Sequence, residues 1–113
     1  MVSGQELFAE RERIKNSLKT SIDKAYGNGV QLAEKTRSYR ILLRQTMLQL
    51  EAEGAKATTL KDIAKGVEEV AEAEFEMMVS EVKYKASNEN IMAQKKLLES
   101  IEADIRREYF KGE

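Results

Sequence analysis

The sequence contains no histidine, no cysteine, no proline and no tryptophan. The commonest general base, the thiolate nucleophile and the usual zinc ligands are therefore missing. Without cysteine there is no disulfide framework, which fits a reducing compartment. Without proline, no residue forces a helix to stop. We therefore expect a protein that is not an enzyme, with no catalytic residue, no cofactor and no metal.

The residues that are present are typical of long, water-facing helices. Of the 113 residues, 35% are charged and 42% are hydrophobic, and alanine, leucine, glutamate, lysine and arginine dominate. Nineteen basic residues oppose 20 acidic ones, so strong non-specific attraction to nucleic acid or anionic lipid is not expected. The longest apolar runs are about three residues, which predicts no membrane span, and Met1–Glu6 lacks the apolar stretch of a signal peptide. The length suits a single helical domain over 1–113.

Apolar positions in the first half recur at steps of three and four, which is helical periodicity close to a heptad. This predicts a helix over about 5–53. Gly27-Asn28-Gly29 is its weak point, because Asn-Gly favours a turn. The stripe keeps its phase there, so a kinked but continuous helix is favoured over a break. The stripe consists of Leu18, Ile22, Ala25, Gly29, Leu32, Thr36, Tyr39, Leu43, Met47 and Leu50.

Gly54 fits the residue just past a helix C-terminus, and a turn is predicted over 54–58. Thr59, three residues before Asp62, resembles a capping box, so a second helix is predicted over about 59–110. Gly66 and the polar run 87–90 are its weak points. Its predicted stripe is Leu60, Ile63, Val67, Ala71, Phe75, Met78, Val82, Ala86, Asn90, Ala93, Leu97, Ile101 and Ile105.

Two long helices joined by so short a turn should lie antiparallel, with facing residue numbers that total about 112. In this register a basic stripe (Arg37, Arg40 and Arg44) meets an acidic stripe (Glu76, Glu72 and Glu68). Each exposed pair is worth only ~0–1 kcal/mol, but together such pairs select a register. The same register predicts further pairs nearer the chain ends: Arg13 with Glu99, Arg11 with Glu102, and Glu6 with Arg106 and Arg107.

Apolar surface near the turn is broader than a two-helix contact can cover, which indicates a further packed helix or a partner. We expect a homodimer in which two hairpins form a four-helix bundle. A monomer folded at its weak points into a compact four-helix bundle is the alternative. Asn90 either fixes the register or marks a local break. The residues expected in the core or self-association surface are Leu43, Met47, Leu50, Leu60, Ile63, Val67 and Asn90.

Two charged clusters suggest other functions. Lys35 and the basic stripe, with Tyr39 interleaved, could follow a nucleic-acid backbone and stack a base. Facing glutamates would neutralise the arginines, so nucleic-acid binding is the alternative function. Glutamates over 68–76 could hold a hard cation, but no histidine completes a carboxylate metal motif, and an arginine-paired, solvated face is favoured.

The segment from Lys56 to Tyr109 contains several short stretches that together resemble a known group of proteins. Its residues are Lys56-Ala57-Thr58-Thr59-Leu60-Lys61-Asp62, Ala71-Glu72-Ala73-Glu74-Phe75, Tyr84-Lys85-Ala86, Glu89-Asn90-Ile91 and Leu97-Leu98-Glu99-Ser100-Ile101. It resembles small helical proteins of phages and prophages of Gram-positive bacteria, often encoded near replication and recombination genes. The resemblance covers about half the chain and brings no catalytic residues. It implies a location in the cytoplasm of the bacterial host.

From these observations we expect a self-associating helical interaction or accessory protein, whose protein partner is unknown. The first alternative is an accessory protein of phage replication or recombination that binds nucleic acid. The second is an inhibitor of a host defence protein, whose acidic face over 68–76 would imitate nucleic acid.

Overall fold

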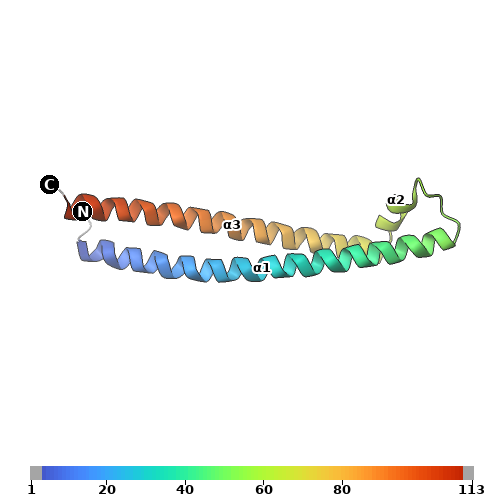
Figure 1. The fold of residues 1–113 in the computed structure, drawn as a ribbon, viewed down its shortest axis with the longest axis horizontal. Helices are drawn as coiled ribbons and strands as arrows, with labels where there is room; N and C mark the ends of the chain where they lie inside the picture. The colour runs from blue at the N-terminus through green and yellow to red at the C-terminus, as the bar shows by residue number, and fades with distance from the viewer. Residues whose placement is uncertain (1–3, 111–113) are drawn as a thin grey trace. The chain divides into compact units, whose positions relative to one another are not determined.

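A computed structural model describes residues 4–110 of the chain. Two long helices, α1 (Gly4–Ala52) and α3 (Glu68–Tyr109), pack against each other as an antiparallel hairpin (Figure 1). The short helix α2 (Leu60–Lys65) lies in the connection between them. No strand occurs within 4–110. The predicted all-α helical hairpin is therefore confirmed.

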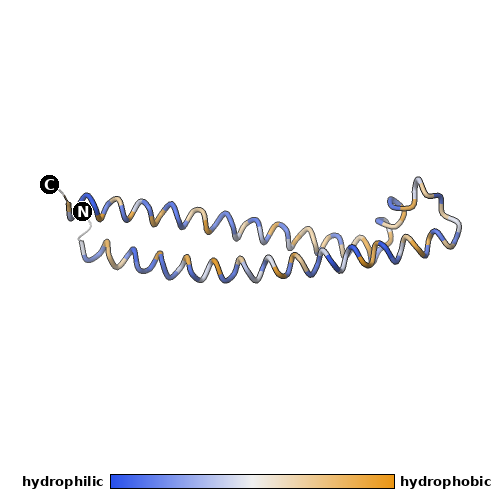
Figure 2. The backbone as a smooth tube through the Cα atoms, viewed as in Figure 1, coloured by the Kyte–Doolittle hydropathy of each residue, from blue (hydrophilic) through white to orange (hydrophobic). Residues whose placement is uncertain are grey.

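The described residues divide into two compact units. The first unit combines residues 4–26 with residues 85–110, and the second is Gly27–Tyr84. Both long helices are continuous across the weak points of the sequence, at 27–29 and 87–90. The local break considered at Asn90 is therefore absent. Figure 2 shows apolar residues recurring at short intervals along both helices, as the heptad-like spacing predicts.

The end of α1 follows the predicted signal. Gly54 has a φ of 96°, a conformation that glycine adopts at little cost. Its N–H donates to the carbonyl of Glu51 at 3.0 Å, and the N–H of Ala55 donates to the carbonyl of Leu50 at 3.0 Å. This pair of hydrogen bonds is the Schellman motif, which satisfies carbonyls left free at a helix end. The turn predicted from Gly54 therefore has the expected geometry.

The start of the second arm differs from the prediction. A single helix was expected over about 59–110, but α2 ends at Lys65 and α3 begins at Glu68. The predicted capping box is also wrong, because Thr59 makes no side-chain cap hydrogen bond. The break lies at Gly66, a residue of low helix propensity, and lets α2 turn its own apolar side inward. Leu60 and Ala64 of α2 are buried, as are Tyr39 of α1 and Val70 of α3.

The antiparallel register agrees with a turn centred near residue 56. In the second unit, the ring of Tyr84 lies against Gly29, where an added Cβ would be 3.0 Å from Tyr84 Cε1. Tyr39 lies opposite Glu74. In the first unit, Tyr109 lies against Gly4. Each of these pairs has residue numbers that total close to the predicted value of about 112.

The face that α3 buries is not the predicted one. In both units most buried and half-buried residues of α3 belong to one series with alternating steps of three and four, as a heptad requires. In the second unit this heptad series is Val70, Ala73, Met77, Ser80 and Tyr84, and in the first it is Ser87, Ile91, Gln94, Leu98, Ile101 and Ile105; Glu74, Ala103 and Asp104 are half-buried at its border. Most of the predicted stripe, including Phe75, Met78, Val82 and Leu97, is exposed. The prediction for this part of the core was wrong by about one position around the helix.

Candidate interaction surface

The exposed apolar residues of α3 in the second unit form a continuous surface. Phe75, Met78, Val79 and Val82 are 61%, 54%, 37% and 68% exposed, and we call them the outer stripe. Their spacing of i, i+3, i+4 and i+7 places them on one side of the helix within about two turns. Monomeric proteins rarely expose contiguous apolar surface without an interaction that covers it. The outer stripe is therefore the leading candidate for a functional surface.

A shallow groove runs along one border of the outer stripe, between α1 and α3. Its lining residues are Gln31, Lys35, Phe75, Glu76, Val79, Ser80 and Lys83. Lys35 Nζ lies 3.0 Å from Glu76 Oε2 across the groove. Both side chains are well exposed, so this ion pair contributes only ~0–1 kcal/mol to stability. The groove combines two apolar residues of the outer stripe with charges of both signs.

Around the connection, a polar cluster joins all three helices. Tyr39 Oη of α1 donates a 2.6 Å hydrogen bond to Glu74 Oε2 of α3. Lys65 Nζ of α2 lies 3.5 Å from the same carboxylate oxygen. Because Glu74 contacts both Tyr39 of α1 and Lys65 of α2, this cluster links α2 to the two long helices.

Each member of this polar cluster has a shifted pKa. Burial and the hydrogen bond to Glu74 raise the pKa of Tyr39 above its usual 10.0. The hydrogen bond from Tyr39, with help from Lys65, lowers the pKa of Glu74 below its usual 4.5. Charge on Tyr39 and on Glu74 raises the pKa of Lys65. The stability from Glu74 is therefore lost as the pH falls through the acid range, and that from Tyr39 and Lys65 is lost as the pH rises beyond their usual values.

The basic stripe does not meet the acidic stripe as predicted. Arg37, Arg40 and Arg44 are exposed, and within 4–110 no ion pair joins them to a glutamate. Glu76 forms an ion pair with Lys35 instead. Nearer the ends of the helices, Arg13 pairs with Glu10 of its own helix rather than with Glu99, and Arg107 pairs with Asp104. The register was predicted correctly, but the ionic partners predicted for Arg13 and for the basic stripe were not.

Arg37 and Arg40 border a shallow depression on α1. The other residues that line it are Gly29, Leu32, Ala33, Thr36 and Ile41. Tyr39, which the sequence places among these arginines, is buried and bound to Glu74, so its ring is not available to stack a base. The arrangement of Lys35, Tyr39 and the three arginines therefore lacks the aromatic part of a single-strand binding surface.

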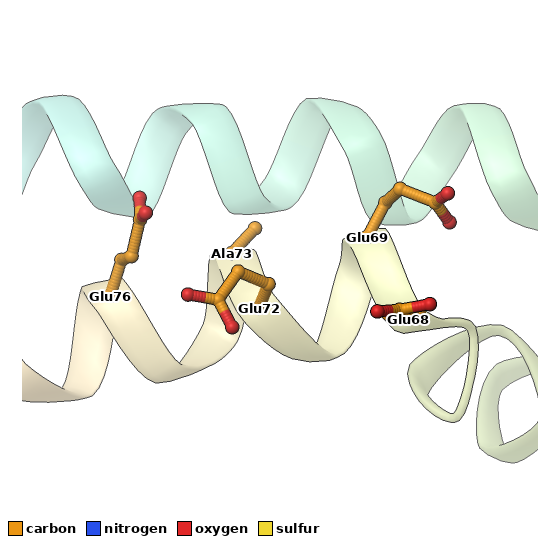
Figure 3. Close-up of a pocket in the computed structure, with 5 residues that line it drawn as sticks. All are labelled: Glu68, Glu69, Glu72, Ala73 and Glu76. Carbon is orange, nitrogen blue, oxygen red and sulfur yellow. The ribbon is translucent and has the colours of Figure 1, made fainter.

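The acidic cluster lines a depression on α3, shown in Figure 3. Its lining residues are Glu68, Glu69, Glu72, Ala73 and Glu76. The side chains of Glu69, Ala73 and Glu76 point toward α1, whereas Glu72 stays beside α3 and Glu68 lies at its start. The carboxylates do not converge on one point. Among the described residues, no group of three or more acidic side chains is placed to hold a metal ion.

The remaining residues singled out in the sequence are distributed between the two units. Leu43, Met47, Leu50 and Val67 are half-buried, and Leu60 is buried. Ile63 is 46% exposed, because Ala64 takes the interior position of α2.

Asn90 belongs to a polar link in the first unit. Asn90 Nδ2 and Gln94 Nε2 both donate to Ser21 Oγ, at 3.1 and 2.8 Å. Ser21 is buried in the face of α1 that contacts α3. Asn90 itself is exposed, so the link is not the buried asparagine that fixes the register of a coiled coil, although it joins the two helices in the predicted register.

Two features of the surface were missed in the sequence. Val79 is out of phase with the predicted stripe, so the width of the outer stripe was not recognised. Lys65 was not connected with Glu74, because the two lie on opposite sides of the break at Gly66. The signal that could have revealed the outer stripe is the set of polar residues Ser80, Ser87 and Gln94. They form a second face at heptad spacing.

The fold and its surfaces define a helical hairpin with a partly polar interior and an apolar exterior stripe. Comparisons with protein-family models, curated proteins and solved structures found no match. Over the described residues, no helix combines the length and the apolar character that crossing a membrane requires.

Proposed function

We propose that this chain is a non-enzymatic helical interaction protein that self-associates. Its origin in a phage or prophage, and its work in the bacterial cytoplasm, are parts of the proposal that rest on the resemblance of Lys56–Tyr109. Such a protein acts by binding other helices: its apolar surface supplies affinity, and its charges select the register and the partner.

The observation that carries this proposal is the orientation of α3. The helix turns a face with Ser80 toward the interior and leaves Phe75, Met78 and Val82 exposed. Burying an apolar side chain of this size contributes about 1.5–3 kcal/mol, so a chain acting alone would gain by the opposite orientation. A partner that covers the outer stripe accounts for the observed choice.

Self-association is tested by the molar mass in solution. Sedimentation equilibrium from low to high micromolar concentration should give a mass that rises from that of the 12.9 kDa chain toward twice that value. A mass that stays at 12.9 kDa throughout would contradict self-association. Capture of a different protein from host cells would then identify a heterologous partner.

One observation favours a second candidate, which is nucleic-acid binding. The three arginines of the basic stripe are exposed without glutamate partners among residues 4–110, so they are available to phosphates. Binding of a fluorescent DNA oligonucleotide should then weaken steeply with salt and disappear in the double variant Arg40→Glu/Arg44→Glu. Lys61→Glu/Lys95→Glu, which makes the same charge change at exposed positions outside the stripe, is the control. Equal binding by both variants would exclude the basic stripe.

A further inference from the structure

We propose that a second copy of this chain packs antiparallel on the outer stripe of α3, about a two-fold axis beside Val79. This inference rests on the self-association proposed above and names the surface that carries it. The occupant is a second outer stripe, so each copy uses Phe75, Met78, Val79 and Val82 to cover the same residues of the other.

The apolar pattern of the outer stripe suits self-pairing. Its residues span about two helical turns with Val79 near the middle. An antiparallel copy centred there places Val79 against Val79 and Phe75 against Val82 of the second copy. The larger ring thus meets the smaller side chain at both ends, and the contact closes on itself as a two-fold interface does.

The charges beside the outer stripe support the antiparallel direction. Glu76 and Lys83 both border the groove along the stripe. They are seven residues apart, so they lie on the same side of the helix, on either side of Val79. A two-fold axis near Val79 brings Glu76 of each copy to Lys83 of the other, twice per dimer. A parallel pairing would instead place this flank of the two copies on opposite sides of the interface, so that neither Glu76 could reach a Lys83 of the other copy.

The outer side of α1 offers a less continuous surface. Within the second unit its exposed large apolar residues are Val30, Ile41 and Leu48, which are separated by 11 and seven residues and interrupted by Arg37 and Arg44. No two of these three are neighbours at i+3 or i+4. Ile22 and Tyr26 are exposed on α1 in the first unit. Pairing α1 of one copy with α3 of another would also leave a free face on each copy, which produces open chains rather than a closed dimer.

Four side chains per copy make a small interface, below the roughly 1,200 Å² of total buried surface typical of stable complexes. The dimer should therefore have a dissociation constant on the order of micromolar. Samples in that concentration range will contain both monomer and dimer, so a variant that weakens the dimer and one that strengthens it will both change the measured mass.

The first experiment compares Val82→Glu on the outer stripe with Ile41→Glu on the outer side of α1. Both original side chains are exposed, at 68% and 52%, so neither variant should unfold the chain, and circular dichroism will confirm helicity. Val82→Glu should raise the dissociation constant at least tenfold, because each of the two new carboxylates of the dimer would face the apolar ring of Phe75 in the other copy. Ile41→Glu should change it less than threefold. A dimer of unchanged affinity in Val82→Glu would overturn this inference and leave self-association intact.

The second experiment uses the absence of native cysteine. Val79→Cys and Val30→Cys are matched, because the two valines are 37% and 42% exposed. With a short bis-maleimide, Val79→Cys should crosslink quantitatively at concentrations that favour the dimer. Val30→Cys should crosslink only slowly. Equal rates, or faster crosslinking through Val30→Cys, would show that α3 is not the contact.

The third experiment tests the direction. Glu76→Lys and Lys83→Glu should each weaken the dimer several-fold, and the double variant should recover wild-type affinity. Lys35→Gln is the control, because it removes the ion pair with Glu76 inside one copy and leaves the outer stripe unchanged. Failure of the double variant to recover would overturn the antiparallel pairing. A wild-type chain that is monomeric at every concentration would instead overturn the proposed self-association itself.

Discussion

Val70 and Val82 of α3 give a matched test of which face of the helix is interior. Val70 is fully buried, whereas Val82 is 68% exposed. Val70→Ala removes two carbon atoms worth about 0.8 kcal/mol each in transfer free energy, and the cavity left behind adds about 1 kcal/mol. Alanine's better helix propensity returns about 0.5 kcal/mol. The expected loss in free energy of unfolding is therefore about 2 kcal/mol.

The same substitution at Val82 should have almost no effect on a single chain. About a third of the residue is covered, so the transfer loss is about 0.5 kcal/mol, and the gain in helix propensity offsets it. Urea unfolding followed by circular dichroism at 222 nm measures both variants. It should be run at low micromolar concentration and again at a tenfold higher one, because dimer formation adds a concentration-dependent contribution at Val82.

Two results would refute this reasoning. A loss below about 0.5 kcal/mol for Val70→Ala would mean that the residue is not in a packed core. A loss for Val82→Ala as large as that for Val70→Ala, at the lower concentration, would mean that α3 turns its predicted stripe toward α1 after all.

Three further predictions concern the polar cluster and the glycines. Tyr39→Phe removes the hydrogen bond to Glu74 and should lower the urea midpoint at pH 7. Because the pKa of Glu74 is lowered in the folded chain, the difference from wild type should shrink by pH 3. A difference that does not depend on pH would contradict this prediction. Gly27→Ala places its Cβ in open space and should stabilise the folded chain by up to about 1 kcal/mol. Gly29→Ala should stabilise it less, because the added Cβ meets the ring of Tyr84. Thermal midpoints compare the two variants, and equal gains would contradict the close approach of Tyr84 to Gly29. Gly54→Ala should destabilise by about 1 kcal/mol in urea unfolding because of the φ of 96°, and an unchanged midpoint would contradict the assigned turn.

The sequence by itself determined the helical class, the turn and the register. Helical periodicity and the absence of proline allow long helices, and Gly54 is the residue type that a helix end with positive φ requires. The register follows from the position of the turn, since two helices joined closely can only run back alongside each other. The contact of Gly29 with Tyr84 and the hydrogen bond of Tyr39 to Glu74 agree with that register.

The tertiary structure decided which face of α3 is interior and which charges pair. Periodicity identifies two adjacent faces, and the more apolar one was chosen as the core. Packing against α1 selects the other face, where Tyr84 fits over Gly29 and Gln94 reaches Ser21. Shape and hydrogen bonding across the pair are properties of two helices together, so no pattern within one helix reveals them. The same holds for the polar cluster of Tyr39, Lys65 and Glu74, which exists only because the break at Gly66 turns α2 toward both long helices.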